Sequence, residues 1–215
     1  MKVNNKKTQL LYMSAGAKGT AYIKPETGDK IESSETLKIL GFEFDRNPNP
    51  GKQIDRIISK FSARTWSLRY LKRSGMQTQD LIHVYITFIR PIAEYAAPSF
   101  QSMLTQEMIN KLERQQARAL KIIYGFHHSY RKTLEMSGLP TLQDRRIILT
   151  DKFALKLAAS EKHKHLFPER PSAQRRARNG NVYTEFPATT QRLYNSPLYY
   201  MRRRLNYLNK DKALT

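Results

Sequence analysis

The chain has 215 residues, enough for one domain or for a small domain with an appendage. It carries 38 lysine and arginine residues against 18 acidic ones, which gives a formal net charge of +20. Such an excess opposes compaction unless a polyanion or another domain neutralises it, and nucleic acid is the partner class that we expect first. On charge alone, a solvated basic surface or a surface for an anionic membrane are the alternatives. The lack of cysteine excludes disulfides, cysteine zinc sites and thiol nucleophiles.

No apolar stretch approaches the roughly 20 residues that a membrane span requires. The basic N-terminus also lacks the apolar segment of a signal peptide. We therefore expect no membrane partner and an intracellular location, either cytoplasmic or nuclear. The sequence predicts no particular oligomeric state.

The first part of the chain is predicted to be β structure. Short strands are expected over residues 8–13 and 20–24, followed by a turn signal, PETGD, at residues 25–29. Residues 37–44 alternate only partly between apolar and polar, so we expect a single strand that is covered on both faces. The NPNPG stretch at residues 47–51 should end the region because its two prolines break ladder pairing.

From Gly51 the apolar period becomes helical, and a first helix is predicted to end near Ser74-Gly75. A second helix begins at residues 78–80, and Pro91 should either kink it or begin a new helix. A third helix is expected over residues 105–124, with Thr105 as its N-cap and a glycine at its end.

Basic side chains recur about once per turn beside the apolar faces of two of these helices. A helix of this kind can lie along a phosphate backbone and position a duplex without reading its sequence. The first stripe consists of Lys52, Arg56, Lys60 and Arg64, and the second consists of Lys111, Arg114, Arg118 and Lys121.

A fourth helical segment is predicted over residues 142–160, with a buried face that comprises Ile147, Ile148, Phe153 and Leu157. From residue 161 onward, prolines and basic residues predict a mobile linker. Ser196-Pro197 then indicates the start of a short C-terminal helix. The arginine clusters at 175–178 and 202–204 are candidates for nuclear import or RNA-binding segments, and a solvated basic tail is an equal alternative.

Residues that could carry catalysis are scarce. Nucleotidyl transfer requires two carboxylates that hold a pair of metal ions, and the nearest arrangement here is Glu43 and Asp45, for which a solvated strand end is the simpler interpretation. The histidines lack the neighbours that a zinc site needs. Arg90 and Glu94, one helical turn apart, are expected to form a structural ion pair. The aromatic residues Trp66, Tyr70 and Tyr85 could stack on bases, although at helical spacing such residues more often belong to a core.

Four stretches of the chain, in this order, resemble one enzyme family. The first is KVNNKKTQLLYMS at residues 2–14, followed by LKILGFEFD at 37–45. The other three stretches are VYITFIRPIAEYAAPSF at 84–100, KLERQQARALKIIYG at 111–125 and GLPTLQDRR at 138–146. Their order and spacing are similar to those of the reverse transcriptases of non-LTR retrotransposons of the LINE or Jockey type.

This resemblance implies that the chain comprises the end of a palm and a thumb. Leu40, Gly41 and Phe42 would then lie in the hairpin that holds the primer end. The basic residues of the two helices, Lys52, Arg56, Lys60 and Arg64 and then Lys111, Arg114 and Arg118, would grip a template-primer duplex or RNA. The family binds Mg²⁺ at an aspartate hairpin that has no counterpart in this sequence. We therefore expect the chain to begin downstream of the catalytic residues and to contain no catalytic residue, no metal site and no cofactor.

The expected fold class is α+β, mainly α. A β-hairpin or small antiparallel sheet at residues 1–46 is followed by a thumb-like helical domain at 51–125 and a helical extension at 126–160. A basic, partly disordered linker and a short helix occupy residues 161–215. Two other functions remain open on the sequence. The chain could be a stand-alone helical RNA- or DNA-binding protein, or a helical scaffold that binds an acidic protein partner.

Overall fold

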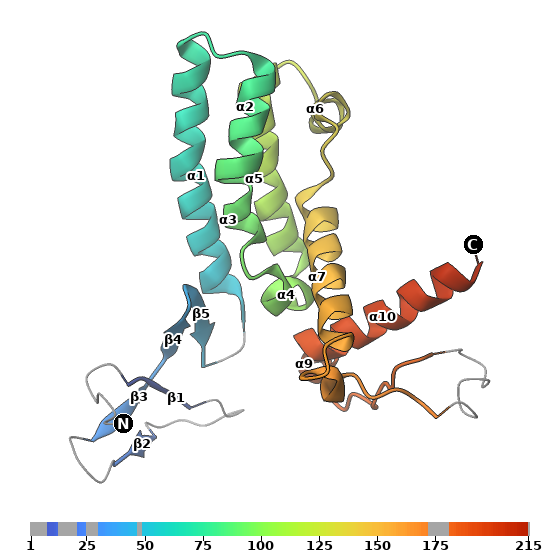
Figure 1. The fold of residues 1–215 in the computed structure, drawn as a ribbon. Coiled ribbons are helices and arrows are strands. Elements are labelled where there is room, and N and C mark those ends of the chain that lie inside the picture. The colour runs from blue at the N-terminus through green and yellow to red at the C-terminus, as the bar shows by residue number, and fades with distance from the viewer. Residues whose placement is uncertain (1–7, 13–20, 25–29, 47–48, 172–180, 215) are drawn as a thin grey trace. The chain divides into compact units, whose positions relative to one another are not determined.

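A computed structural model describes residues 8–12, 21–24, 30–46, 49–171 and 181–214. The fold is mainly helical with a small sheet near the N-terminus, which confirms the expected α+β class (Figure 1). Contacts group the chain into two compact units, Met1–Ile57 and Ile58–Thr215, and the division falls within the first helix, α1 (Gly51–Arg73).

In the first unit, three short strands form a sheet in the order β1-β3-β2. Strand β1 (Leu10–Leu11) pairs in parallel with β3 (Ile31–Ser34), and β2 (Tyr22–Ile23) pairs with β3 in the antiparallel sense. These strands lie within the first two predicted strand segments and the region that follows them. The predicted turn at 25–29, and the ends of the flanking predictions at Met13 and Thr20, lie outside the described residues.

The prediction of one strand over residues 37–44 is wrong, because the chain reverses within it. Strand β4 (Thr36–Ile39) and strand β5 (Phe42–Asp45) form an antiparallel hairpin in which Ile39 pairs with Phe42. The two residues between them, Leu40 and Gly41, have φ angles of 48° and 82°. Positive φ at both central residues is the requirement of the tight turns that connect twisted strands. The hairpin is not covered on both faces, since Ile39 and Leu40 are exposed.

Helix α1 begins where the predicted break occurs. The side chain of Asn49 accepts a hydrogen bond from the Gly51 amide at 2.9 Å, and the Ile54 amide bonds to the Pro50 carbonyl. The helix ends at Arg73, and Gly75 follows with a φ of 86°, a left-handed geometry that favours glycine. The helical apolar period from Gly51 comprises six residues, of which four are buried and two, Ile58 and Leu71, are partly buried. The buried four are Ile54, Ile57, Phe61 and Leu68.

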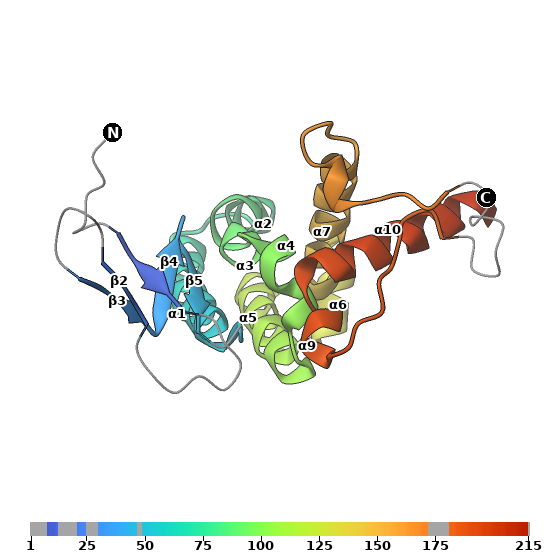
Figure 2. The ribbon, with the colours of Figure 1, turned by 90° about the horizontal axis from the view of Figure 1, so that it is seen from below.

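In the second unit, the remainder of α1 packs beside α2 (Thr78–Val84) and α5 (Gln106–Tyr124), as Figures 1 and 2 show. Thr105 caps α5 as predicted, because its hydroxyl accepts from the Met108 amide, and Gly125 ends the helix. The sequence predicts an apolar face of α5 made of Met108, Ile109, Leu112, Ala119, Ile122 and Ile123. Of these, only Met108 is not buried, while Gln116 and Leu120 join the buried residues. The short connecting elements are α3 (Pro91–Glu94), α4 (Ala97–Phe100), η3 (Gln101–Met103) and α6 (Tyr130–Ser137).

The chain passes from α2 into α3 through a wider helical turn, η2 (Tyr85–Ile89). In this turn the Arg90 amide bonds to the carbonyl of Tyr85, five residues back. Pro91 then occupies the first turn of α3, where its missing N–H costs nothing. The proline therefore begins a new helix, which was one of the two predicted outcomes. Arg90 and Glu94 form the expected ion pair at 2.8 Å.

The buried face of helix α7 (Leu142–Ala158) is not the predicted one. Ile148 and Phe153 are 41% and 42% exposed, whereas Arg146, Thr150 and Asp151 are buried. The polar side of α7 is buried because its side chains form hydrogen bonds in the interior. Arg146 Nε donates to the side chain of Gln101, and the Thr150 hydroxyl donates to the Arg146 carbonyl.

A carboxylate on α5 fixes the start of α7. Glu113 accepts hydrogen bonds from the amides of Leu142 and Gln143 and from the Tyr130 hydroxyl. Amides at a helix start have no partner within the helix, so an anion there is favourable. Gln116 lies one turn further along α5 and joins the same network, with hydrogen bonds to both Tyr85 and Tyr130.

The described residues after α7 contain more regular structure than the predicted linker and short helix. Helix α10 (Pro197–Leu214) is longer than the predicted short helix and packs against α7 and α4 (Figure 2). The segments between α7 and α10 contain η4 (Lys164–Leu166), an isolated bridge between Glu169 and Tyr183, and α9 (Gln191–Tyr194). A small core formed by Ala154, Phe167, Met201 and Leu205 holds these elements together.

Candidate nucleic-acid interface

The first two cations of the α1 stripe are engaged within the first unit. Lys52 Nζ lies 2.9 Å from a carboxylate oxygen of Asp45, and this hydrogen bond raises the pKa of Lys52. Arg56 donates to the Gly41 carbonyl at 3.2 Å and lies 4.0 Å from the Glu43 carboxylate. Both cations thus stabilise the β4–β5 hairpin and are only partly available to an external anion.

The two later cations of the stripe belong to the second unit and differ from each other. Arg64 donates to the Phe88 carbonyl at 3.1 Å, and its guanidinium lies 4.3 Å from the centre of the Phe88 ring. Lys60 is exposed and forms no ion pair with any described residue. Of the four predicted residues, Lys60 is therefore the one whose charge has no protein partner in the described part of the chain.

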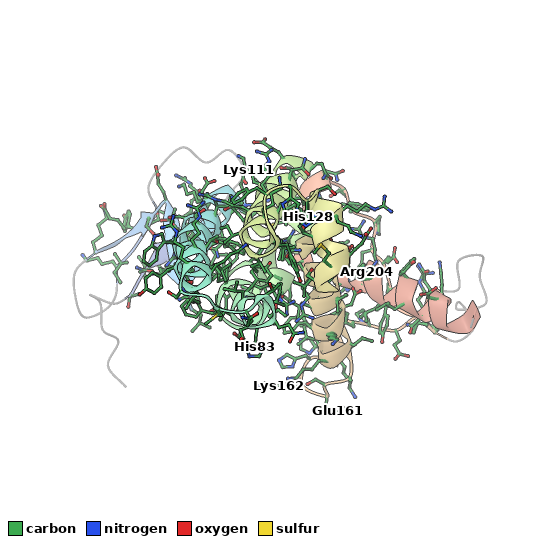
Figure 3. All side chains as sticks on the ribbon, turned by 90° about the horizontal axis from the view of Figure 1, so that it is seen from above. His83, Lys111, His128, Glu161, Lys162 and Arg204 are labelled. Atoms are coloured by element: carbon green, nitrogen blue, oxygen red, sulfur yellow. The ribbon has the colours of Figure 1, made fainter. Side chains whose placement is uncertain are left out.

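The stripe on α5 is more open. Lys111 forms an exposed ion pair with Glu107, one turn earlier, at 2.9 Å, and Figure 3 shows Lys111 at the outer edge of the bundle. The pKa of Glu107 is lowered mainly by its hydrogen bond with Lys111 and further by the positive charge of Lys111. Arg114 and Arg118 are exposed, and neither forms a salt bridge with the described residues. Two guanidinium groups of α5 are thus available to an anion.

The residues that resemble a primer hairpin lie at the end of the β4–β5 hairpin. Leu40 is the most exposed large apolar residue described, at 87%, and Gly41 forms the other half of the turn. Phe42 instead is buried, with 7% exposure, and its ring lies 4.7 Å from that of Phe44. The three residues are contiguous, but only the first two form an accessible tip.

The seam between α1 and α5 carries a cluster that the basic stripes did not predict. Trp66 and Tyr70, one turn apart on α1, are 65% and 59% exposed. Their rings stack on each other with centroids 5.7 Å apart and an interplanar angle of 19°. Arg69 lies between them in the sequence, and Arg73 follows one turn later; both are exposed and form no ion pair with described residues. The arginines and the aromatic pair share the solvent side of the helix because they are spaced by three or four residues.

Two hollows follow this seam. One has a volume of about 170 Å³ and is lined by Ser62, Thr65, Trp66, Arg69 and Arg118. The other has a volume of about 450 Å³ and is lined by Arg69, Lys72, Arg73, Ile122 and Phe126. Arg69 contributes to both, so the hollows adjoin along α1. We call the six residues Trp66, Arg69, Tyr70, Arg73, Arg118 and Phe126 the aromatic-basic seam.

Lys72 joins helix α1 to the end of α5 beside the seam. Its ammonium group donates to the carbonyls of Ile122 and Ile123 at 2.7 and 2.9 Å. Carbonyls in the last turn of a helix lack partners within the helix, and a cation is favourable there. A further hydrogen bond joins Ser62 to Gln115 at 2.9 Å. Helices α1 and α5 are therefore tied together at both ends of the seam.

Trp66, Tyr70 and Tyr85 were considered for base stacking, and the prediction is wrong for Tyr85. It is fully buried, its hydroxyl donates to Gln116 at 2.6 Å, and burial raises its pKa. Trp66 and Tyr70 are accessible, although helical spacing favoured a place in the core. The sequence did contain a signal, since the two arginines of the seam alternate with the two aromatic residues over residues 66–73.

The arginine cluster at 202–204 is not a solvated tail. Arg202 donates twice to the Leu166 carbonyl, and Arg203 donates to the Tyr194 carbonyl. Arg204 forms a bidentate pair with Asp151 at 2.9 and 2.6 Å, at the crossing of α7 and α10 (Figure 3). These side chains hold α10 against its neighbours, which removes them as candidates for a free RNA-binding segment. The cluster at 175–178 lies outside the described residues.

No group of three or more acidic or histidine side chains in the described ranges is arranged to hold a metal ion. Glu43 and Asp45 face the α1 cations already named. Figure 3 shows His83 and His128 on separate elements, and the centre of the His128 ring lies 3.9 Å from that of the His127 ring. Within the described residues, no helix is both long and apolar enough to cross a membrane.

Comparison of the chain with protein-family models, with curated proteins and with solved structures gave no match. Function must therefore be inferred from the residues and their arrangement.

Proposed function

We propose that this chain binds nucleic acid through the exposed sides of α1 and α5, as the palm end and thumb of a non-LTR retrotransposon reverse transcriptase. The observation that carries the proposal is a set of exposed cations without ion-pair partners among the described residues. They are Lys60, Arg69, Arg73, Arg114 and Arg118. Phosphate oxygens would neutralise these charges and release condensed counterions.

The composition of α1 supports this assignment. The helix has seven basic residues and one acidic residue, Asp55. Lys52 and Arg56 have carboxylate partners, but the remaining positive charge of the helix opposes folding through self-repulsion, and a polyanion relieves it. Two other cations of the second unit, Arg145 and Arg204, already have carboxylate partners in Glu94 and Asp151.

The family assignment is supported by the four sequence stretches and by the architecture of each unit taken separately. The first unit contains a tight hairpin at Leu40-Gly41, and the second is a helical bundle in which α1 and α5 are long, amphipathic and basic. The proposal gives this chain a role in gripping a template-primer duplex and assigns the chemistry to residues outside it. The genomic sequence before the Met1 codon tests this part. It should encode the aspartate hairpin in the same reading direction, and unrelated sequence there would favour a stand-alone nucleic-acid-binding protein.

Charge reversal tests the binding itself. The double variant Lys60→Glu/Arg114→Glu should bind a fluorescently labelled RNA/DNA duplex at least tenfold more weakly than the wild type, as measured by anisotropy at fixed salt. The matched control is Lys156→Glu/Lys162→Glu, which changes the net charge equally on and just beyond α7, where Figure 3 shows Lys162. Equal losses in both variants would mean that binding follows total charge and not this surface.

The competing interpretation, a scaffold for an acidic protein, is tested in the same assay. Polyglutamate should displace the duplex only at a large excess of carboxylate over phosphate. Displacement at equal charge concentration would favour the acidic protein partner.

Purified chain incubated with a primed template and Mg²⁺ or Mn²⁺ should give no extension, and measurable extension would overturn the assignment of the chemistry to other residues.

A further inference from the structure

Besides the stacked pair on α1, ten aromatic side chains of the described chain are exposed. Six of those rings lie beneath a cation, at distances between 3.5 and 5.9 Å. They belong to Tyr12, Tyr22, Phe88, Phe186, Tyr194 and Tyr207. Trp66 and Tyr70 have no cation over their faces among the described residues, and they stack only on each other.

The exposure of this pair has no explanation in packing. Tryptophan is highly buried on average, whereas Trp66 is 65% exposed and the neighbouring Leu68 and Thr65 fill the core. The rings therefore do not stabilise the bundle by burial. They present a flat apolar surface to solvent beside two guanidinium groups.

An apolar flat surface flanked by cations matches a specific ligand chemistry. Nucleobases have π-faces that stack on aromatic rings, and their phosphates require cations a short distance away. In a duplex the base faces are covered by neighbouring base pairs, so only an unpaired base can reach Trp66. The hollow beside Trp66 contains Arg69 and Arg118, and the adjoining hollow combines Arg69 and Arg73 with the 70% exposed ring of Phe126.

We propose that the aromatic-basic seam binds a single-stranded segment of nucleic acid. Bases stack on Trp66 and Tyr70, phosphates contact Arg69 and Arg118, and a further nucleotide enters the larger hollow with its base against Phe126. This proposal rests on the nucleic-acid binding proposed above and adds the unpaired strand as the ligand of this surface. Charge favours this occupant over an apolar protein segment, because all three cations of the seam are exposed arginines without ion-pair partners in the described chain.

The chain contains a natural probe for this site, since Trp66 is its only tryptophan. Titration with an oligouridine of twelve nucleotides should quench the fluorescence of Trp66. A blunt duplex with the same number of phosphates should bind with little quenching. An oligomer of the same length that carries abasic sites should bind more weakly and leave the fluorescence unchanged.

Affinity measurements on variants complete the test. Trp66→Leu should weaken oligouridine binding about tenfold and leave blunt-duplex binding within twofold of the wild type. The matched control is Phe153→Leu, which truncates an exposed aromatic residue of α7 and should change neither affinity. Because both side chains are exposed, both variants should retain the wild-type circular dichroism.

The outcomes separate the two proposals. If the duplex binds but oligouridine causes no quenching, or if the abasic oligomer binds equally well, the stacking site is overturned and the duplex grip stands. If neither ligand binds, the proposed function itself fails. Polyglutamate could also displace oligouridine when its carboxylate concentration equals the phosphate concentration, so that the quenching disappears. That result would assign the seam to an acidic protein and overturn the proposal.

Discussion

Gln116 offers the sharpest test of how the helical unit is held together. Its side chain is fully buried and makes three hydrogen bonds. It accepts from the Tyr85 hydroxyl at 2.6 Å and donates to the Pro140 carbonyl at 2.9 Å and to the Tyr130 hydroxyl oxygen at 3.1 Å. One residue therefore connects α5 with η2, with α6 and with the segment that leads into α7.

Replacing Gln116 with leucine keeps the approximate volume and removes all three bonds. Tyr130 keeps a partner in Glu113, but the Tyr85 hydroxyl and the Pro140 carbonyl lose theirs. A buried polar group left unpaired costs about 1–3 kcal/mol, so we expect Gln116→Leu to lower the free energy of unfolding by about 3 kcal/mol. With a urea m-value of about 2 kcal/mol/M, the midpoint should fall by about 1.5 M.

The assay is urea unfolding followed by circular dichroism at a helix wavelength, and its control is Gln106→Leu at the exposed start of α5. Adding Tyr85→Phe to the Gln116→Leu background removes the unpaired hydroxyl. The double variant should therefore lose about 1 kcal/mol less than the sum of the two single variants. A loss below about 1 kcal/mol for Gln116→Leu, or full additivity with Tyr85→Phe, would refute the idea that this network joins the helices.

Three further predictions concern other parts of the molecule. Asp151→Asn should free Arg204 and cost about 2 kcal/mol, with faster amide hydrogen exchange in α10 than in α5; equal acceleration in both helices would contradict a local role. Burial raises the pKa of Tyr85 and of Tyr130 above the ordinary value near 10, so the folded state keeps both protons at a pH where the unfolded state releases them. The contribution of these two tyrosines to stability should therefore be constant below about pH 10 and fall above it by up to about 1.4 kcal/mol per pH unit for each tyrosine, and Tyr130→Phe should reduce the slope above pH 10; an unchanged slope would exclude Tyr130 as a source. Leu40→Asn should stabilise the β4–β5 hairpin by about 1 kcal/mol because asparagine tolerates a positive φ, and slower exchange of the amides that pair β4 with β5 would be the measure; faster exchange would show that Leu40 makes contacts that outweigh the backbone strain.

Local signals in the sequence were sufficient for the main helices. Thr105 and Gly125 set the bounds of α5, and Gly75 ends α1, because caps and left-handed residues act over a few positions. The resemblance placed Leu40 and Gly41 in a hairpin, but the apolar pattern did not, because leucine rarely adopts a positive φ and the run is typical of one continuous strand. Helix α6 lies within the predicted helical extension at 126–160 but was not predicted as a separate helix, although the Ser129 side chain caps it by accepting a hydrogen bond from the Lys132 amide.

The buried face of α7 and the pairing of the cations depend on tertiary contacts that the sequence does not reveal. The buried side of α7 depends on Gln101, which lies 45 residues from its partner Arg146, and no periodicity reveals that pair. Four of the seven predicted nucleic-acid contacts prove to have protein partners, namely Lys52, Arg56, Arg64 and Lys111. Which cations remain unpaired depends on where the carboxylates and carbonyls of other elements fall. Arg69 and Arg73 were overlooked because they lie outside the regular stripe, at the edge of the hollows that residues of α1 and α5 line together.

The salt dependence of duplex affinity tests the central claim most directly. If Lys60, Arg69, Arg73, Arg114 and Arg118 all neutralise phosphates, the logarithm of the association constant should fall against the logarithm of the salt concentration with a slope of about −4.5. In Lys60→Glu/Arg114→Glu the slope should become shallower by about 2. A slope near zero for the wild type, or the same slope in the variant, would contradict nucleic-acid binding by this surface.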